Sequence, residues 1–159
     1  MSAIAKIDFD EMIMNIKKGI YKQIGFGSGR LVFDVGGGYV AKVAKNKRGI
    51  AQNEAEYYIS SVDRSNLFAK IREVSDDSGI LIMEKAERIS NFSDIRNFFM
   101  ARNNRELFQK KEIQEVIKEH QLIPQDLYNL DSWGMVNGRP VIIDYGFTWS
   151  VKRRYYFPF

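Results

Sequence analysis

The sequence predicts an α+β fold, with an antiparallel sheet in its first half and mainly helices in its second half. Two observations support this prediction. The glycine-containing segments 27–29 and 36–38 separate three short strand-like runs, which is the pattern of an antiparallel meander. After about residue 87 the pattern becomes helical. A chain of 159 residues is therefore expected to form one domain, 1–159, with an N-terminal lobe at 1–86 and a short C-terminal lobe at 87–159.

The N-terminal lobe is expected to hold five strands. A helix over about 8–18 comes first, with Asp8 as its cap and Gly19 at its end. A second helix is expected over about 51–61, between the third and fourth strands. Its apolar residues recur at helical spacing. The expected strands cover about 20–26, 30–35, 39–44, 67–74 and 79–85.

The C-terminal lobe is expected to contain two helices and a hairpin. Ser93 is the expected cap of the first helix, and a longer helix covers about 105–120 until Pro124 stops the pattern. An irregular stretch follows. The dipeptide Asn137-Gly138 between apolar runs then indicates a tight hairpin, and Asp144 comes at the end of its second strand.

Composition excludes several classes of site. Cysteine is absent, which excludes disulfides and thiolate metal sites, and His120 is the only histidine, which excludes a His-rich zinc site. No apolar run approaches the roughly 18 residues of a membrane span, and the N-terminus does not resemble a signal peptide, so a cytoplasmic protein is expected. The net charge of +4 is too mild to indicate nucleic-acid binding, and the basic aromatic stretch 152–157 is expected to be a solvated tail.

Three glycines, Gly25, Gly27 and Gly29, lie between the first two predicted strands. Closely spaced glycines let backbone N–H groups approach a phosphate without interference from side chains. In isolation, such a segment is more often only the turn of a hairpin. Both interpretations stay open at this point.

Lys42 lies inside an otherwise apolar strand, where an unpaired buried ammonium would be costly. A phosphate on one side and a carboxylate on the other would explain its position. The following helix offers that carboxylate in Glu54 and Glu56. The alternative is that Lys42 lies on an exposed face of the strand and that both glutamates are solvated.

Three aspartates give the strongest signal. Asp131 follows Asp126 by five residues, and Asp144, which opens Asp-Tyr-Gly, follows Asp131 by thirteen. We expect Asp126 in a loop, Asp131 at the start of a strand and Asp144 at the end of a strand, and these positions can meet at one edge of a sheet. Carboxylates that lie close together repel one another unless a cation or a proton neutralises them. Mg²⁺ favours such oxygen ligands and is often bound by one or two carboxylates together with nucleotide phosphates. The alternative is that the three aspartates separately cap turns.

Together, these motifs resemble the signature set of the protein-kinase-like superfamily. Five motifs occur in the same order as in that family, over about residues 20–148. They are a glycine loop, a lysine in a strand, a glutamate in a helix, an Asp-x4-acid motif and an Asp-aromatic-Gly motif. The run 132–146 is also similar to short kinase-like proteins encoded by bacteriophages. The resemblance implies a minimal kinase-like fold, with a five-stranded antiparallel sheet and one helix in the first lobe and a truncated, mainly helical second lobe.

The resemblance also implies ATP and Mg²⁺ as ligands. Lys42 would hold the nucleotide α- and β-phosphates and pair with Glu56 or, as the less favoured option, Glu54. Asp126 would orient or deprotonate the acceptor hydroxyl, while Asp131 and Asp144 would hold Mg²⁺. The remaining nucleotide contacts are implied for the glycine loop, at Gly25, Gly27 and Gly29, and for the segment between the lobes, at Met83, Glu84, Lys85 and Ala86.

The sequence departs from the family pattern at several points. Asp131 stands where asparagine is usual, and Pro124 and Gln125 stand where His-Arg is usual. Only 15 residues follow Asp144, so the activation segment and the later helices, which hold a peptide substrate in protein kinases, are expected to be missing.

Two functions are therefore carried forward. The first is an ATP- and Mg²⁺-dependent phosphotransferase with an unknown acceptor. The second is a catalytically weak or inactive kinase-like binding protein, a pseudokinase that could serve a virus as an accessory factor in the host cytoplasm by binding an unknown protein. A nucleic-acid binder is disfavoured. Outside these motifs, His120, Trp133 and Trp149 are expected to be core residues.

Overall fold

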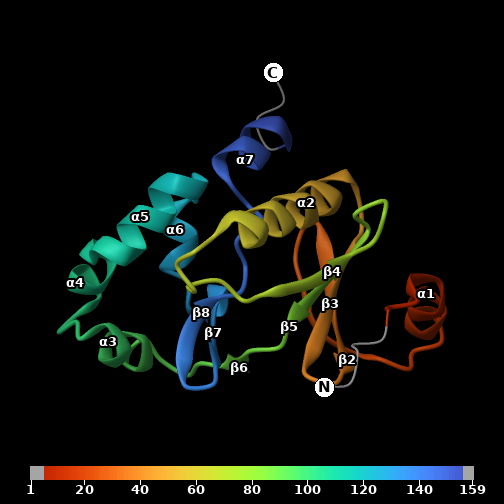
Figure 1. Ribbon diagram of the computed structural model, residues 1–159, viewed down its shortest axis with the longest axis horizontal. Helices are drawn as coiled ribbons and strands as arrows, with labels where there is room; N and C mark the ends of the chain where they lie inside the picture. Colours follow the sequence, from red (N-terminus) through yellow and green to blue (C-terminus); the bar gives the residue numbers. More distant parts are fainter. Residues whose placement is uncertain (1–5, 156–159) are drawn as a thin grey trace.

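The computed structural model describes residues 6–155 and has an α+β architecture (Figure 1). A five-stranded antiparallel sheet has the strand order β1-β2-β3-β5-β4, and every strand expected in the first half is present. Its strands are β1 (Lys22–Phe26), β2 (Arg30–Gly36), β3 (Tyr39–Ala44), β4 (Ile71–Val74) and β5 (Ile80–Glu84). The fourth strand is shorter than predicted, because Phe68, instead of joining this sheet, forms an isolated bridge with Ile142.

Two helices cover opposite faces of this sheet, α1 (Phe9–Lys17) and α2 (Lys47–Val62). Alternation along β3 explains why both faces are buried, since successive strand residues point to opposite sides. Val40 belongs to the main core on the α2 side, while Ala41 belongs to a smaller cluster that includes Met12 of α1. The first lobe therefore contains two helices, α1 in addition to the one that the resemblance implied.

The ends of these helices follow from their caps. The Asp8 carboxylate accepts a hydrogen bond from the Glu11 N–H at 3.0 Å, as the sequence predicts, and Gly19 follows the helix with a positive φ of 72°. Helix α2 begins at Lys47, earlier than the predicted residue 51, because the Asn46 side chain accepts from the Gly49 N–H and caps it.

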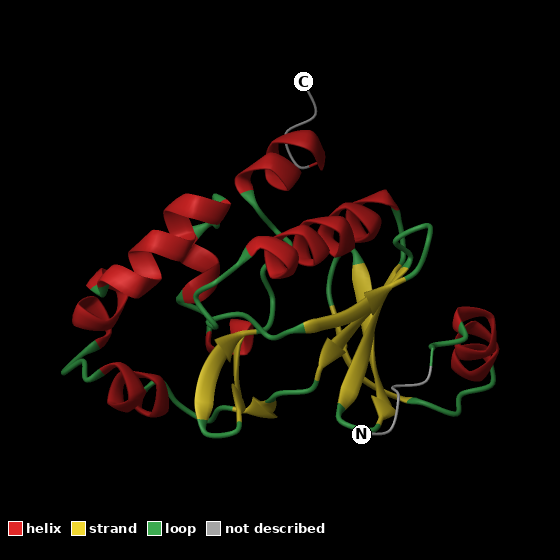
Figure 2. Ribbon diagram, in the orientation of Figure 1, coloured by secondary structure: helices red, strands yellow, loops and turns green. Residues whose placement is uncertain are grey.

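The second half combines helices with a small sheet (Figure 2). The sheet has the order β6-β7-β8, and its hairpin turns at Asn137 and Gly138, whose positive φ values of 51° and 75° suit the tight turn that the sequence predicts. The strands are β6 (Glu87–Arg88), β7 (Trp133–Val136) and β8 (Arg139–Ile142). The helices are α3 (Ser93–Phe99), α4 (Asn104–Gln109), α5 (Lys111–His120), α6 (Pro124–Leu127), a 3₁₀ turn η1 (Leu130–Ser132) and α7 (Trp149–Tyr155).

Two local predictions in this half are wrong. Ser93 is the first helical residue and not the cap, and its N–H donates to the side chain of Asn91. The long helix predicted over 105–120 is two helices, because Lys110 has an extended backbone with ψ of 138°. The break allows Leu107 and Ile113, on either side of it, both to be fully buried in one core.

One hydrophobic core joins the two halves of the chain. It extends from Val40 and Leu81 of the large sheet to Ile113 of α5 and Trp133 of the hairpin. Trp133 is a core residue as predicted, whereas Trp149 was wrongly assigned to the core, because it lies at the start of α7 with 38% of its surface exposed. Within residues 6–155, no helix combines the length and apolar character that crossing a bilayer requires.

Candidate active site

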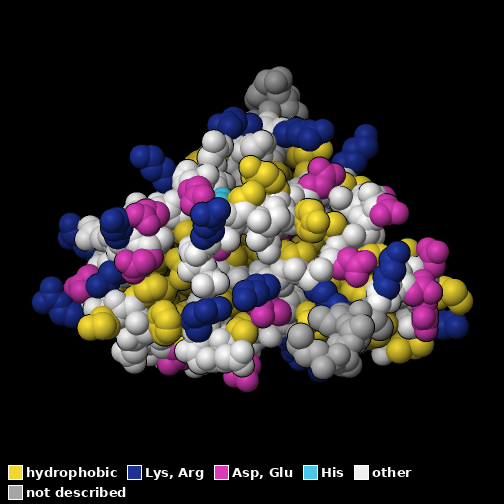
Figure 3. Space-filling model, in the orientation of Figure 1, with side chains coloured by type: hydrophobic (Ala, Val, Ile, Leu, Met, Phe, Trp, Pro, Cys, Tyr) yellow, Lys and Arg dark blue, Asp and Glu magenta, His cyan; other side chains and the backbone are white. Residues whose placement is uncertain are grey.

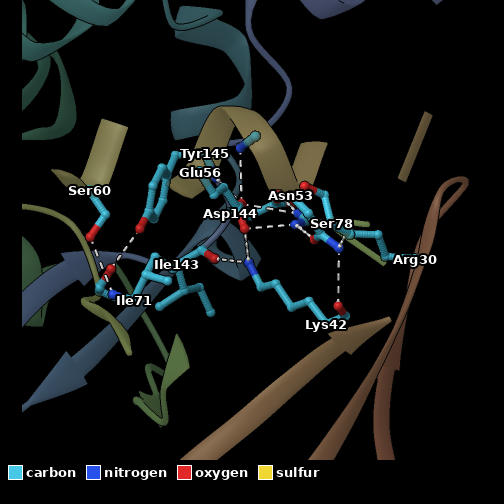
Figure 4. Close-up of polar contacts among 12 residues, drawn as sticks. Arg30, Lys42, Asn53, Glu56, Ser60, Ile71, Ser78, Ile143, Asp144 and Tyr145 are labelled. Carbon is cyan, nitrogen blue, oxygen red and sulfur yellow. Dashed lines mark hydrogen bonds and ion pairs between the residues drawn. The ribbon is translucent and has the colours of Figure 1, made fainter. Parts of the chain in front are cut away.

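Lys42 and Glu56 form a buried ion pair between β3 and α2 (Figure 4). The Lys42 ammonium donates to the two Glu56 carboxylate oxygens at 2.9 and 3.1 Å, and its third bond goes to the carbonyl of Ile143. Glu54, the other candidate partner, is exposed on the same helix. The pairing of Lys42 with Glu56 is thereby confirmed, and the alternative of an exposed Lys42 is wrong, since its surface is only 6% accessible.

Arg30 completes this network, although its role was not predicted from the sequence. It is the first residue of β2, directly after the glycine loop, and its guanidinium forks onto both Glu56 oxygens at 2.7 and 3.0 Å. The same group donates to the Asn53 amide oxygen and to Asp144 at 3.3 Å. A bidentate arginine fixes a carboxylate in orientation as well as in charge, so Arg30 and Lys42 together hold Glu56 in one position.

The charges of Arg30, Lys42 and Glu56 stabilise one another in the buried network. Burial by itself would raise the pKa of the Glu56 carboxyl, but the adjacent Arg30 and Lys42 outweigh it and lower the pKa to about 2. Burial lowers the pKa of Lys42, against the opposing effect of Glu56. Two cations and one anion would leave excess positive charge in a nonpolar interior. The carboxylate of Asp144, at the edge of the network, offsets part of it.

Glu56 also anchors the Asp-Tyr-Gly segment. The backbone N–H groups of Tyr145 and Gly146 each donate to the same Glu56 oxygen at 2.9 Å. The segment runs close to α2, because a Cβ at Gly146 would lie only 2.5 Å from the Gln52 carbonyl oxygen. The Tyr145 hydroxyl donates to the Ala69 carbonyl at 2.7 Å, and burial raises its pKa. Asp144 is therefore held at a defined place beside Lys42 and Arg30.

The glycine loop has a packing role at one end and is open at its tip. A Cβ at Gly29 would lie 2.9 Å from the Gly49 nitrogen, and the Gly29 carbonyl accepts a hydrogen bond from Lys45, so this end is fitted against the start of α2. Around Gly27 a Cβ would meet no described atom within 4 Å, and at Gly25 it would touch only Val32 at ordinary distance. Within the described part of the chain, a methyl group at Gly27 would thus meet only solvent, while Gly29 is required for packing.

The acid loop is the stretch 126–132, which runs from α6 through η1 to β7. Asp126 lies in the short helix α6 and Asp131 in η1, so neither has the loop or strand-start position that the sequence predicted. The Ser132 hydroxyl donates to the Asp126 carbonyl at 2.7 Å, and the Ser132 carbonyl accepts from Ile143 at 2.7 Å, which ties the loop to the Asp-Tyr-Gly segment. The Asn129 side chain accepts from the Asp131 N–H at 3.0 Å. Asp131 is exposed.

Asp126 and Asp144 are electrostatic neighbours. Burial, followed by the charge of Asp144, raises the pKa of the half-buried Asp126, while Lys152 of α7 acts in the opposite direction. The Asp144 side chain is 59% exposed and has one oxygen bonded to Arg30. Within residues 6–155, no three side chains of His, Cys, Asp or Glu are grouped so that they alone could hold a metal ion. The pair Asp126 and Asp144 is the closest approach to the predicted trio.

The segment between the lobes is largely engaged within the protein. Met83 is 1% exposed and its side chain packs in the core, and the Glu84 N–H donates to the Lys70 carbonyl at 2.9 Å. Ala86 lies against the hairpin, where a Cβ at Gly134 would approach it to 2.5 Å. The predicted contact of Met83, Glu84 and Ala86 with an adenine base stays a prediction.

His120 lies in the core. Its ring packs edge-on against Phe68, with ring centroids 5.5 Å apart. Its Nε2 atom is 3.5 Å from the Asp63 carboxylate, and neither atom has a hydrogen-bond partner among the described residues. The predicted core position of His120 is confirmed, since only 8% of its surface is exposed.

The chain was compared with protein-family models, with curated proteins and with solved structures, and none of the three comparisons found a match.

Proposed function

We propose that the chain is a minimal kinase-like phosphotransferase, which binds ATP with Mg²⁺ and transfers the γ-phosphoryl group to a hydroxyl acceptor. The observation that carries the proposal is the convergence of Lys42, Glu56 and Asp144 from three separate segments into one hydrogen-bonded unit. Phosphoryl transfer depends mainly on positioning and on charge stabilisation. A lysine fixed by a buried carboxylate, beside an exposed aspartate, supports both.

The residues fit a magnesium ion that shares its coordination with phosphates. Mg²⁺ needs only one or two carboxylates when a nucleotide supplies further oxygens. Asp144 has an exposed carboxylate whose charge adds to the effect of burial in raising the pKa of its neighbour Asp126, and a cation would relieve that repulsion. Bound there, Mg²⁺ would neutralise phosphate charge. Asp144 is its best-supported ligand, and Asp131 is a ligand by resemblance alone.

Asp126 is the proposed base. Its raised pKa makes the carboxylate a better proton acceptor than an ordinary aspartate. The hydrogen bonds of Ser132 and Ile143 hold its loop next to Asp144. Lys42 would bind the nucleotide phosphates, together with the backbone of the glycine loop around Gly27, where no described atom lies within 4 Å of a Cβ position.

A second candidate, a kinase-like binding protein without transfer activity, is favoured by a specific observation. The bonds of Lys42 go to Glu56 and to the Ile143 carbonyl, and Arg30 occupies one oxygen of Asp144. The charged groups thus satisfy one another. A phosphate would have to replace the Ile143 carbonyl at Lys42, and a metal would have to share Asp144 with Arg30.

Incubation with γ-labelled ATP and Mg²⁺ separates the two candidates. The phosphotransferase should move label to itself, to a small molecule or to a protein of a cell extract, and Asp126→Asn should abolish this transfer. Asp76→Asn, in the exposed turn between β4 and β5, is the matched control and should transfer label at the wild-type rate. Absence of transfer by the wild type and by both variants would support the binding protein and reject the enzyme.

A further inference from the structure

A groove lies between helix α7 and the corner formed by α5 and α6. It is largely open to solvent and has a volume of about 520 Å³. Gln121, Gln125 and the exposed indole of Trp149 line it, together with Lys118 of α5 and Arg153 of α7. Gln125 and Pro124 of α6 line the groove, and Asp126, the proposed catalytic base, is the next residue of the same short helix but is not itself part of the lining.

The groove is a fixed feature of the fold, because backbone contacts hold α7 in place. The Trp149 N–H donates to the Gln121 carbonyl at 3.0 Å, and Leu122 forms an antiparallel bridge with Thr148. Val151, on the inner side of α7, is buried. The start of α7 therefore stays against the end of α5, and the space between them does not depend on a mobile segment.

The charge of the groove is positive. Lys118 and Arg153 are exposed on its two sides, and none of the described residues that line it is acidic. Lys152, next to Arg153, is close enough to Asp126 for its charge to lower the pKa of that carboxyl. Figure 3 shows lysine and arginine side chains gathered at the α7 end of the molecule. Two cations beside a groove whose lining includes Ile117, Leu122 and Pro124 favour an anionic ligand with an organic body.

We propose that this groove binds the phosphate acceptor, and that the acceptor is a small organic anion carrying a hydroxyl group. The inference rests on the proposed phosphotransferase function and names its substrate class. Lys118 and Arg153 would hold the anionic group, and the amides of Gln121 and Gln125 would hydrogen-bond the hydroxyl-bearing part. The acceptor hydroxyl would then be directed towards Asp126.

The transfer step balances with ATP as the co-reactant. The acceptor oxygen forms a bond to the γ-phosphorus while the bond from that phosphorus to the β,γ-bridging oxygen breaks, and ADP leaves with the electron pair. The hydroxyl proton passes to the Asp126 carboxylate. The products are the phosphorylated anion and ADP.

Calorimetric titration with glycerol 3-phosphate and ribose 5-phosphate tests the groove, with glycerol and ribose as neutral counterparts. We expect at least one phosphate compound to bind about tenfold more tightly than its counterpart, since a charge-assisted hydrogen bond contributes on that scale. Lys118→Gln and Arg153→Gln should each weaken this binding about tenfold. Arg154→Gln removes the same charge from the neighbouring position outside the groove lining and should leave affinity unchanged. The bound compound should also accept label from ATP.

Two affinity results would overturn the inference. One is equal affinity for the charged and neutral compounds, and another is an equal loss of affinity in Arg153→Gln and Arg154→Gln. The melting temperature with ATP and Mg²⁺ identifies which proposal has failed, because a ligand of the folded state must raise it. If ATP raises the melting temperature but no anion binds, the groove proposal is rejected and the phosphotransferase proposal stands. If an anion binds but ATP does not raise the melting temperature, the phosphotransferase proposal is rejected, and the acceptor role of the groove is rejected with it.

Discussion

The network around Glu56 and the loop that carries Asp126 lie side by side, yet they are built in opposite ways. Glu56 is fully buried and accepts hydrogen bonds from two cationic side chains and two backbone N–H groups. Asp126 is half-buried, and the charge of Asp144 acts against its ionisation. In the first region the charged groups bind one another and fix the structure. In the second region the carboxylates are partly exposed and can bind a ligand. Substitutions should therefore affect stability in the network and activity in the acid loop.

The largest stability effect is expected from Glu56→Gln. The change keeps the side-chain size but leaves Arg30 and Lys42 buried without their main anion. Removing one partner of a buried pair typically costs about 3–5 kcal/mol. Urea unfolding followed by circular dichroism measures it. Glu54→Gln, exposed on the same helix, is the control and should change stability by less than about 0.5 kcal/mol; equal losses in both variants would contradict the account.

Acid should reveal the same network without mutation. The pKa of Glu56 is lowered from 4.5 to about 2 in the folded protein. A depressed carboxyl pKa stabilises the fold at pH values above the unfolded pKa, and the benefit is lost as pH falls from about 4.5 through about 2. The shift corresponds to about 3 kcal/mol. Unfolding free energies measured across this range should fall more steeply for the wild type than for Glu56→Gln, and parallel curves would show that Glu56 is not the responsible group.

A smaller effect is expected where the Asp-Tyr-Gly segment meets α2. In Gly146→Ala the new methyl group would lie 2.5 Å from the Gln52 carbonyl oxygen. Overpacking of this kind costs about 1–3 kcal/mol. Gly27→Ala is a matched control, because no described atom lies within 4 Å of the new methyl group. Thermal unfolding should separate the two variants, and an unchanged melting temperature for Gly146→Ala would show that the segment is not closely packed on the helix.

The smallest stability effect is expected from Asp126→Asn. The substitution retains hydrogen-bonding capacity and removes the repulsion from Asp144, so the free energy of unfolding should change by less than about 0.5 kcal/mol. Urea unfolding of this variant, beside Glu56→Gln, completes the comparison. A loss of several kcal/mol would mean that Asp126 belongs to the structural network.

The network around Glu56 could be predicted from the sequence where a charged residue lies in an otherwise apolar strand. Lys42 required a buried partner, and the order of motifs selected Glu56, which is the partner found. Arg30 was not assigned a role, although an arginine opening the apolar run of β2 offered the same signal. The sequence does not show that its guanidinium reaches Asp144 as well as Glu56, because that contact joins residues 114 positions apart.

The acid loop was predicted less completely, since spacing alone does not give side-chain direction. Asp126 and Asp144 are electrostatic neighbours, as convergence of the acids requires, but Asp131 is exposed, and within residues 6–155 no three acidic side chains form a metal-binding group. The helix break at Lys110 also has no sequence signal. There, burial of Leu107 and Ile113 overrides the continuous helical pattern. The groove at α7 depends on Trp149, which the sequence wrongly assigned to the core.

Calorimetric titration of ATP, with Mg²⁺ and then with EDTA, tests the central claim most directly. The claim is that the buried network holds Lys42 and Asp144 as a site for a nucleotide with its metal ion. The account predicts clear binding with Mg²⁺, little binding in EDTA because the carboxylates repel the phosphates, and loss of the Mg²⁺-dependent binding in Asp144→Asn. Equal affinity in both solutions, or unchanged Mg²⁺-dependent binding by Asp144→Asn, would contradict it.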